Sequence, residues 1–262
     1  MEVLKILSDY YGNYHEDRRL TSRHGSVEFL TTMRYVEKYL QPGMRVLEIG
    51  AATGRYSHTL ARQGYQVDAV ELVQHNIDIF KSNTLPCENV RIFQGNAKNL
   101  DILPDNAYDV TLLLGPMYHL FTVPEQLEAL SEAIRVTKKG GVVFAAYCGN
   151  EATMVQYCFG RGMIREQRYK DLIDPVTFKA SSDPAELFQL YRKEDIDRLM
   201  RVFPVTRLHY VGTDMATNYM RQTIDEMDNE LFDLYLRYHF AICERGDLVG
   251  ASHHILDIFR KD

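Results

Sequence analysis

The sequence has few cysteines, no long apolar run and no signal-like N-terminus. Its four cysteines lie far apart, without a C-x-x-C pair or a His at zinc spacing, which points to reduced thiols and to no metal site. The longest stretch free of Asp, Glu, Lys and Arg, residues 110–124, falls short of the roughly 20 apolar residues that cross a bilayer. We therefore expect a cytoplasmic protein without a membrane segment.

Positive charge is also scarce. The 262 residues include 30 Lys and Arg against 36 Asp and Glu, a formal net charge of −6, and no long basic run. A dedicated duplex-DNA binder needs a basic face, so a nucleic-acid partner is not expected. The 45% of hydrophobic residues is enough to bury a full core.

The first half of the chain alternates strand-like and helix-like patterns, which predicts an open parallel α/β sheet with helices on both faces. Short apolar runs predict strands over residues 44–49, 65–72, 90–94, 108–114 and 142–147. Amphipathic patterns predict helices over residues 55–63, 74–83 and 124–137. The second half adds predicted helices over 193–202 and 224–244 and predicted strands over 205–212 and 253–260.

We expect one domain over residues 1–262. Its predicted parts are an N-terminal helical cap (1–43), a cofactor-binding core (44–148), a lid or substrate insertion (149–192) and closing helices and strands (193–262). Ligands of such sheets bind beyond the carboxyl ends of the strands, so chemistry is expected there.

A glycine-rich turn follows the first predicted strand. Gly50 and Gly54 allow a tight bend and a close approach to a ligand, and the following helix offers free amides. Glu48 adds a carboxylate suited to a cationic amino group, and Glu71 ends the second strand, where an acid binds ribose hydroxyls. Together they predict a nucleoside-containing cofactor. NAD fits less well, because Ala52 stands at its second glycine position and Glu48 would repel a pyrophosphate.

The sequence resembles the class I S-adenosylmethionine-dependent methyltransferases over about residues 26–148. The stretches VLEIGAATGRYS (46–57), AVEL (69–72), GNAKNL (95–100), YDVTLLLGPMYHL (108–120) and VTKKGGVVFAAY (136–147) follow the family's motif order. HHILDIFR (253–260) is similar to the family's antiparallel last strand. The resemblance implies a Rossmann-like, doubly wound, seven-stranded sheet, mostly parallel with an antiparallel last strand, and a helical lid insertion.

The resemblance also implies S-adenosyl-L-methionine as cofactor and a role for each matching residue. The methionine and ribose side would be lined by Glu48, Gly50, Ala52 and Gly54. Glu71 would hold the ribose hydroxyls, with Leu72, Asn96 and Ala97 around the adenine and Gly115 near the methionine tail. Since Ala52 replaces a common Gly, we expect its backbone to keep a negative φ.

The segment Gly115-Pro116-Met117-Tyr118-His119 is the candidate acceptor side. Tyr118 could wall the methyl channel and exclude water from the sulfonium, and His119 could remove a proton from a hydroxyl or amine. A hydrogen-bonded structural role for His119 is the alternative. Gly115 offers no side-chain acceptor for a target amine, which disfavours a nucleobase or amide substrate.

Three further groups could contribute. The three arginines at 161, 165 and 168 would share one face if their segment is helical and, with Lys170, could meet an anionic substrate. Four tyrosines could line a substrate pocket: Tyr147, Tyr157, Tyr169 and Tyr191. N-terminal residues that could fold over the cofactor are Tyr10, Tyr11, Arg18, Arg23 and His24.

The sequence therefore predicts a methyltransferase acting on a small-molecule acceptor. The alternatives are a methyltransferase of RNA or protein, which the net charge disfavours, and a non-catalytic module that binds S-adenosylmethionine. A homodimer is left open.

Overall fold

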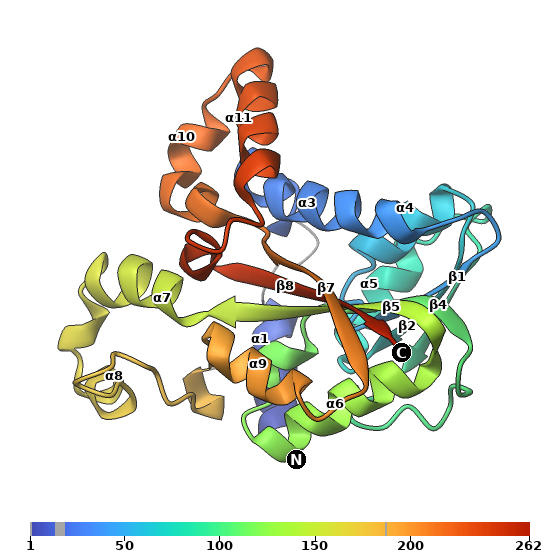
Figure 1. Cartoon of the computed structure of the whole chain (residues 1–262), viewed down its shortest axis with the longest axis horizontal. Coiled ribbons are helices and arrows are strands. Elements are labelled where there is room, and N and C mark those ends of the chain that lie inside the picture. The colour runs from blue at the N-terminus through green and yellow to red at the C-terminus, as the bar shows by residue number, and fades with distance from the viewer. Residues whose placement is uncertain (1, 14–18, 187) are drawn as a thin grey trace.

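An eight-stranded sheet organises the chain, and it confirms the predicted α/β fold with an antiparallel last strand (Figure 1). The computed structural model describes residues 2–13, 19–186 and 188–262. The strands are β1 (Arg45–Ile49), β2 (Gln66–Glu71), β3 (Val90–Gln94), β4 (Tyr108–Leu113), β5 (Thr137–Gly149), β6 (Leu190–Tyr191), β7 (Val205–Gly212) and β8 (His254–Lys261).

The strand order is β3-β2-β1-β4-β5-β8-β7, with β6 paired to the end of β5. Strands β1 to β5 run parallel, and β8 is antiparallel to both β5 and β7. All seven predicted strands are present. The prediction missed β6, whose two residues are too few to show a periodic pattern, and placed the start of β5 too late.

Helices connect the strands, and many are short. The α-helices are α1 (Glu2–Asn13), α3 (Arg23–Tyr39), α4 (Arg55–Arg62), α5 (Gln74–Asn83), α6 (Val123–Val136), α7 (Asn150–Thr153), α8 (Gln167–Leu172), α9 (Lys193–Met200), α10 (Arg221–Asp225) and α11 (Asn229–Ile242). The tighter or wider turns are η1 (Pro116–His119), η2 (Met154–Phe159), η3 (Met163–Arg165), η4 (Pro184–Glu186), η5 (Met215–Met220) and η6 (Val249–Ala251). No helix in the described ranges is long and apolar enough to cross a membrane.

The core lies on both faces of the sheet, because successive strand residues point to opposite sides. In β1, Val46 packs in the cluster beneath α3 and α4, whereas Leu47 packs in the cluster that includes residues of α6 and α9. In β5, Phe144 packs in the cluster beneath α3 and α4, and Val143 packs in the cluster that includes residues of α6 and α9. All four side chains are fully buried, so helices cover both faces as predicted.

The strand order reverses at β1. The chain runs from β1 outward to β2 and β3, then returns to place β4 on the other side of β1. The carboxyl ends of β1 and β4 therefore border a crevice that the crossover connections leave uncovered.

The segment over residues 149–192 is a succession of short turns in place of one helix. Arg161 lies in the turn after η2, Arg165 in η3 and Arg168 in α8, so the expected shared helix face is wrong. Gly162, with a φ of +71°, interrupts the helical path between them, a backbone conformation that favours glycine.

The predicted helix over 224–244 is divided into α10 and α11. Asp228 begins the second helix by accepting a hydrogen bond from the Leu231 backbone N–H at 2.9 Å. A side-chain N-cap of this kind satisfies one of the free amides at a helix start. Figure 1 shows α10 and α11 projecting away from the sheet.

Candidate active site

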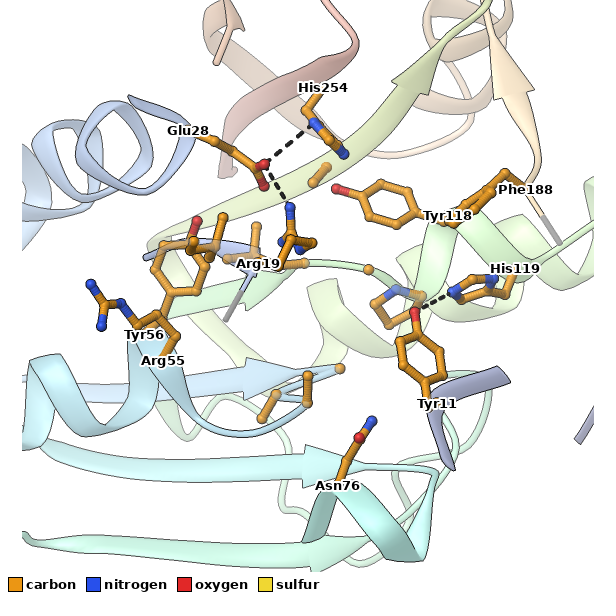
Figure 2. A pocket seen from close by; sticks show the side chains of 18 of the residues that line it. Tyr11, Arg19, Glu28, Arg55, Tyr56, Asn76, Tyr118, His119, Phe188 and His254 are labelled. Atoms are coloured by element: carbon orange, nitrogen blue, oxygen red, sulfur yellow. Dashed lines mark hydrogen bonds and ion pairs between the residues drawn. The ribbon is translucent and has the colours of Figure 1, made fainter. Parts of the chain in front are cut away.

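A cavity of about 1130 Å³ lies at the carboxyl ends of the parallel strands, and most of the predicted site residues line it (Figure 2). Its walls come from the ends of β1 and β2, the turns after β1, β2, β3 and β4, the N-terminal helices and the start of β8. Pockets that bury a single drug-sized molecule measure about 300–1,000 Å³. The cavity is therefore slightly larger than a typical site for one such molecule.

The glycine-rich turn after β1 forms one wall. Gly50 has a φ of +80°, and a Cβ there would lie 2.5 Å from Pro116 Cδ and 2.8 Å from the Leu114 carbonyl oxygen. The amides of Gly50 and Ala51 both donate to the Val70 carbonyl, at 2.8 and 3.1 Å. Only glycine allows the turn to pass this close to the end of β4.

The expected negative φ of Ala52 is wrong, since its φ is +46°. This conformation points the Ala52 backbone N–H at Glu71 Oε2, 2.9 Å away. The left-handed region costs an alanine roughly 1–2 kcal/mol. A hydrogen bond to a charged group contributes about 1.5–3 kcal/mol, which offsets that strain.

Gly54 is the one predicted cofactor residue that does not line the cavity. Its φ is +90°, and a Cβ would lie 2.6 Å from the His58 and Phe80 side chains. Gly54 therefore sets the start of α4 and its packing against α5, and its contact with a ligand stays a prediction.

Glu71 ends β2 and is 6% exposed. Its carboxylate accepts the backbone N–H groups of Ala52 and Val73, both at 2.9 Å, and more distantly the Asn76 side-chain amide at 3.4 Å. Burial raises the pKa of Glu71 although these hydrogen bonds oppose the shift. The carboxylate is thus fixed at the edge of the cavity and ties the turn after β1 to β2.

Glu48 lies beneath the turn and is 2% exposed. One carboxyl oxygen, Oε2, accepts the Ser57 backbone N–H at 2.9 Å and is also bonded by the Ser57 hydroxyl. Burial raises the pKa of Glu48 to about 8, with the Ser57 hydrogen bonds opposing the rise. At pH 7 the group is mainly protonated, and a cation beside it would favour the carboxylate.

The end of the cavity next to β2 and β3 is lined by Leu72, Asn96 and Ala97. Asn96 Oδ1 accepts the Lys98 backbone N–H at 3.0 Å, which leaves the amide nitrogen as the donor that can face a ligand. Leu72 packs in an apolar cluster with residues of α1, among them Leu7 and Tyr11. The N-terminal segment therefore covers this end.

The acceptor segment follows β4. Gly115, with a φ of +111°, precedes η1, and Tyr118 and His119 both line the cavity. His119 Nε2 lies 3.0 Å from the Tyr11 hydroxyl (Figure 2). Burial raises the pKa of Tyr118 well above its ordinary value, so its hydroxyl stays protonated.

Only some of the N-terminal candidates line the cavity. Tyr10, Tyr11 and His24 line the cavity. Arg23 does not, and its guanidinium binds the Asp228 carbonyl at 3.0 Å and Asn229 Oδ1 at 2.8 Å. Arg18 lies outside the described residues.

The four tyrosine candidates also separate. Only Tyr157 lines the cavity. Tyr147 and Tyr191 are core residues whose ring centroids lie 4.9 Å apart. Tyr169 packs against a separate small cluster around Met154.

A charged cluster that the sequence did not reveal lies above Tyr118. Glu28 Oε2 pairs with Arg19 at 2.7 Å, and His254 Nδ1 lies 3.3 Å from the same oxygen and 2.7 Å from Asp214 Oδ2 (Figure 2). Burial lowers the pKa of His254, but the carboxylates of Glu28 and Asp214 outweigh it and hold that pKa above its usual value. The raised pKa favours the positively charged form of His254 between the two carboxylates.

Residues of types that can bind a metal ion also lie close together here. Single atoms of Asp214, His253 and His254 lie within 4.8 Å of one another. The Asp214 carboxylate accepts hydrogen bonds from the His253 and His254 backbone amides, the Ser252 hydroxyl, His254 Nδ1 and the Asn218 amide. These five donors use its lone pairs, so the geometry is that of a hydrogen-bonded acid that orients His254.

The family comparison agrees with this arrangement. Residues 46–141 match a family model described as a methyltransferase domain. The match spans the glycine turn, Glu71 and the acceptor segment, all of which contribute to the lining of the cavity.

Relatives and solved structures give a similar result for the fold. A demethylmenaquinone methyltransferase of Staphylococcus aureus is 32% identical over 108 residues, 40% of this chain and 43% of that protein. The chain thus covers less than half the length of this curated relative. The CcbJ methyltransferase of Streptomyces caelestis aligns over 97% of this chain and 96% of its own, with a TM-score of 0.59 and 16% identity. A methyltransferase of Methanosarcina mazei described as S-adenosylmethionine-dependent aligns over 87% and 96%, with a TM-score of 0.58 and 14% identity.

Proposed function

We propose that the protein is an S-adenosylmethionine-dependent methyltransferase that acts on a small-molecule acceptor. One observation supports this most strongly: two buried acids, Glu48 and Glu71, lie on either side of the Gly50 turn in the cavity of a methyltransferase domain. A zwitterionic amino-acid tail suits Glu48, and a ribose diol suits Glu71. NAD would bring a pyrophosphate toward Glu48. A pyrophosphate requires positively charged partners, and a glutamate side chain cannot carry a positive charge.

The residues present fit an adenosyl amino acid. Gly50 and Gly115 leave backbone open on the methionine side, while Leu72, Ala97 and the Asn96 amide offer an apolar slot with one polar edge for adenine. Glu71 is held by backbone amides, so it would meet the ribose hydroxyls without reordering. The cofactor, when bound, supplies an electrophilic methyl group on a sulfonium.

We assign the acceptor side to Tyr118 and His119. Tyr118 would exclude water from the methyl group, and its ring would stabilise the positive sulfonium. His119, whose Nε2 meets the Tyr11 hydroxyl, would accept the proton that the acceptor loses. The segment over 149–192 would act as a lid, since Tyr157 and Arg161 from it line the cavity.

We also propose a cytoplasmic location, which the four free cysteines support. A homodimer is compatible with the exposed apolar side chains of α11, Leu231, Leu234 and Tyr238.

The test is calorimetric binding of S-adenosylhomocysteine, the expected product. Glu71→Ala should weaken binding at least about a hundredfold, since two hydrogen bonds to a charged acceptor contribute about 1.5–3 kcal/mol each. Asp68→Ala is the matched control. Asp68 is a buried acid on the same strand, bonded to Arg91 and Tyr108, and it does not line the cavity.

Asp68→Ala should lower the free energy of unfolding and leave the dissociation constant unchanged. If both variants bind the ligand as tightly as the wild type, the ribose role of Glu71 is wrong. Transfer of a labelled methyl group to a panel of small acceptors then separates an enzyme from a module that only binds the cofactor.

A further inference from the structure

The far end of the cavity carries two arginines that the proposed methyl transfer does not use. Arg161 lies in the turn after η2 and Arg221 begins α10, and both line the cavity together with Tyr157 and His253. The Gln156 side-chain amide donates to the Asn218 carbonyl at 2.8 Å, which joins the two segments. Arginines from separate parts of the chain therefore meet at one end of one cavity.

Tyr157 is the point on which both guanidinium groups converge. The Arg161 guanidinium carbon lies 4.6 Å from the centroid of the Tyr157 ring, and Arg221 Nη2 lies 3.4 Å from the Tyr157 hydroxyl. Arg221 Nε also donates to Asn218 Oδ1 at 2.8 Å, and the Asn218 amide in turn bonds Asp214. Arg221 is thus held by its Nε, so the rest of its planar fork can bind a ligand.

No ion pair joins either of these arginines to a carboxylate among the described side chains of residues 5–12, 19–186 and 188–262. Three other arginines do have one: Arg19 pairs with Glu28, Arg168 with Glu166, and Arg192 with Glu151. Two guanidinium groups without acids, beside a tyrosine and a cavity, are the donor set that carboxylates and phosphates prefer.

A continuous row of rings leads from these arginines to the proposed methyl-transfer position. Ring centroids lie 5.7 Å apart for Tyr157 and His253, 5.0 Å for His253 and His254, and 5.9 Å for His254 and Tyr118. A ligand lying along this row would have one end at the arginines and the other beside Tyr118.

We infer that Arg161, Arg221 and Tyr157 form a subsite for an oxyanion on the methyl acceptor, a carboxylate or a phosphate group. Only the identification of the ligand as the methyl acceptor rests on the proposed function. The oxyanion site itself is inferred from the positions of the two arginines. The acceptor is then an anionic molecule that carries its nucleophile at the end remote from its oxyanion.

The test uses the full chain saturated with S-adenosylhomocysteine and titrated with benzoate, benzamide and inorganic phosphate. Benzoate and benzamide share a shape and differ in charge, so benzoate should bind at least about tenfold more tightly, the effect of one charge-assisted hydrogen bond. Binding of phosphate without binding of benzoate would identify the oxyanion as phosphate-like. Failure of both oxyanions to bind would overturn the subsite.

Variants locate the binding. Arg161→Gln and Arg221→Gln should each weaken oxyanion binding about tenfold, whereas Arg165→Gln, an exposed arginine of the same segment that does not line the cavity, should leave it unchanged. Arg161 makes only a ring contact, so its variant should keep the melting temperature of the wild type.

Equal oxyanion affinity in wild type and both cavity variants would refute the assignment, as would equal binding of benzoate and benzamide together with no binding of phosphate. If S-adenosylhomocysteine does not bind the wild type, the proposed function fails. The same oxyanion titrations of the unliganded protein then still decide the subsite.

Discussion

Glu48 provides a quantitative prediction about cofactor binding. Burial raises its pKa to about 8, so at pH 7 about nine-tenths of the molecules carry a proton on this group. The amino group of the proposed ligand is a cation, and a cation beside a carboxyl group favours its ionised form. Binding of S-adenosylhomocysteine at pH 7 should therefore release nearly one proton from Glu48.

Calorimetry in two buffers of different ionisation enthalpy, phosphate and imidazole, measures the released protons directly. Wild type should show a buffer-dependent enthalpy at pH 7 that fades by pH 9, where Glu48 is already mainly ionised. Glu48→Gln preserves the shape of the side chain and removes the titration, so its binding enthalpy should not depend on the buffer. Equal proton release by wild type and Glu48→Gln would refute the pairing of Glu48 with the amino group.

Three further predictions concern the turn and the acceptor side. Gly50→Ala should lower the free energy of unfolding by about 1–3 kcal/mol more than Gly64→Ala, since both have a positive φ but only the first Cβ meets other atoms; equal urea midpoints would contradict the close approach. Ala52→Gly should raise the free energy of unfolding by about 1 kcal/mol by relieving the positive φ, and a loss of stability would argue against strain there. His119→Gln should lower turnover about a hundredfold with an unchanged dissociation constant for S-adenosylhomocysteine; wild-type turnover would assign His119 a structural role.

The sheet could be predicted from the sequence because each strand has its own local pattern. The short runs ending at Ile49, Glu71 and Leu113 are at least half apolar, and all but one position of each strand is buried, as strands covered on both faces require. The closeness of Gly50 and Glu71 could also be predicted, because the ends of adjacent parallel strands meet at one edge of the sheet.

The charged cluster above Tyr118 could not be predicted. Arg19, Glu28, Asp214 and His254 come from the N-terminal segment, the end of β7 and the start of β8, and nothing in the spacing along the chain links them. The same holds for Arg161 and Arg221, which only the tertiary fold brings to Tyr157.

The backbone conformation of Ala52 was also predicted wrongly. A general preference of alanine for negative φ predicted Ala52 wrongly, because the preference ignores the carboxylate that its amide must reach. A single alanine residue can adopt the left-handed region where a tertiary hydrogen bond offsets the strain.

The central claim is that the cavity binds an adenosyl amino acid between Glu48 and Glu71. Calorimetric titration of the wild-type protein with S-adenosylhomocysteine and, separately, with NAD tests it most directly. We predict saturable one-to-one binding of S-adenosylhomocysteine and no binding of NAD at the same concentrations. Saturable binding of NAD, with no heat from S-adenosylhomocysteine, would contradict the account.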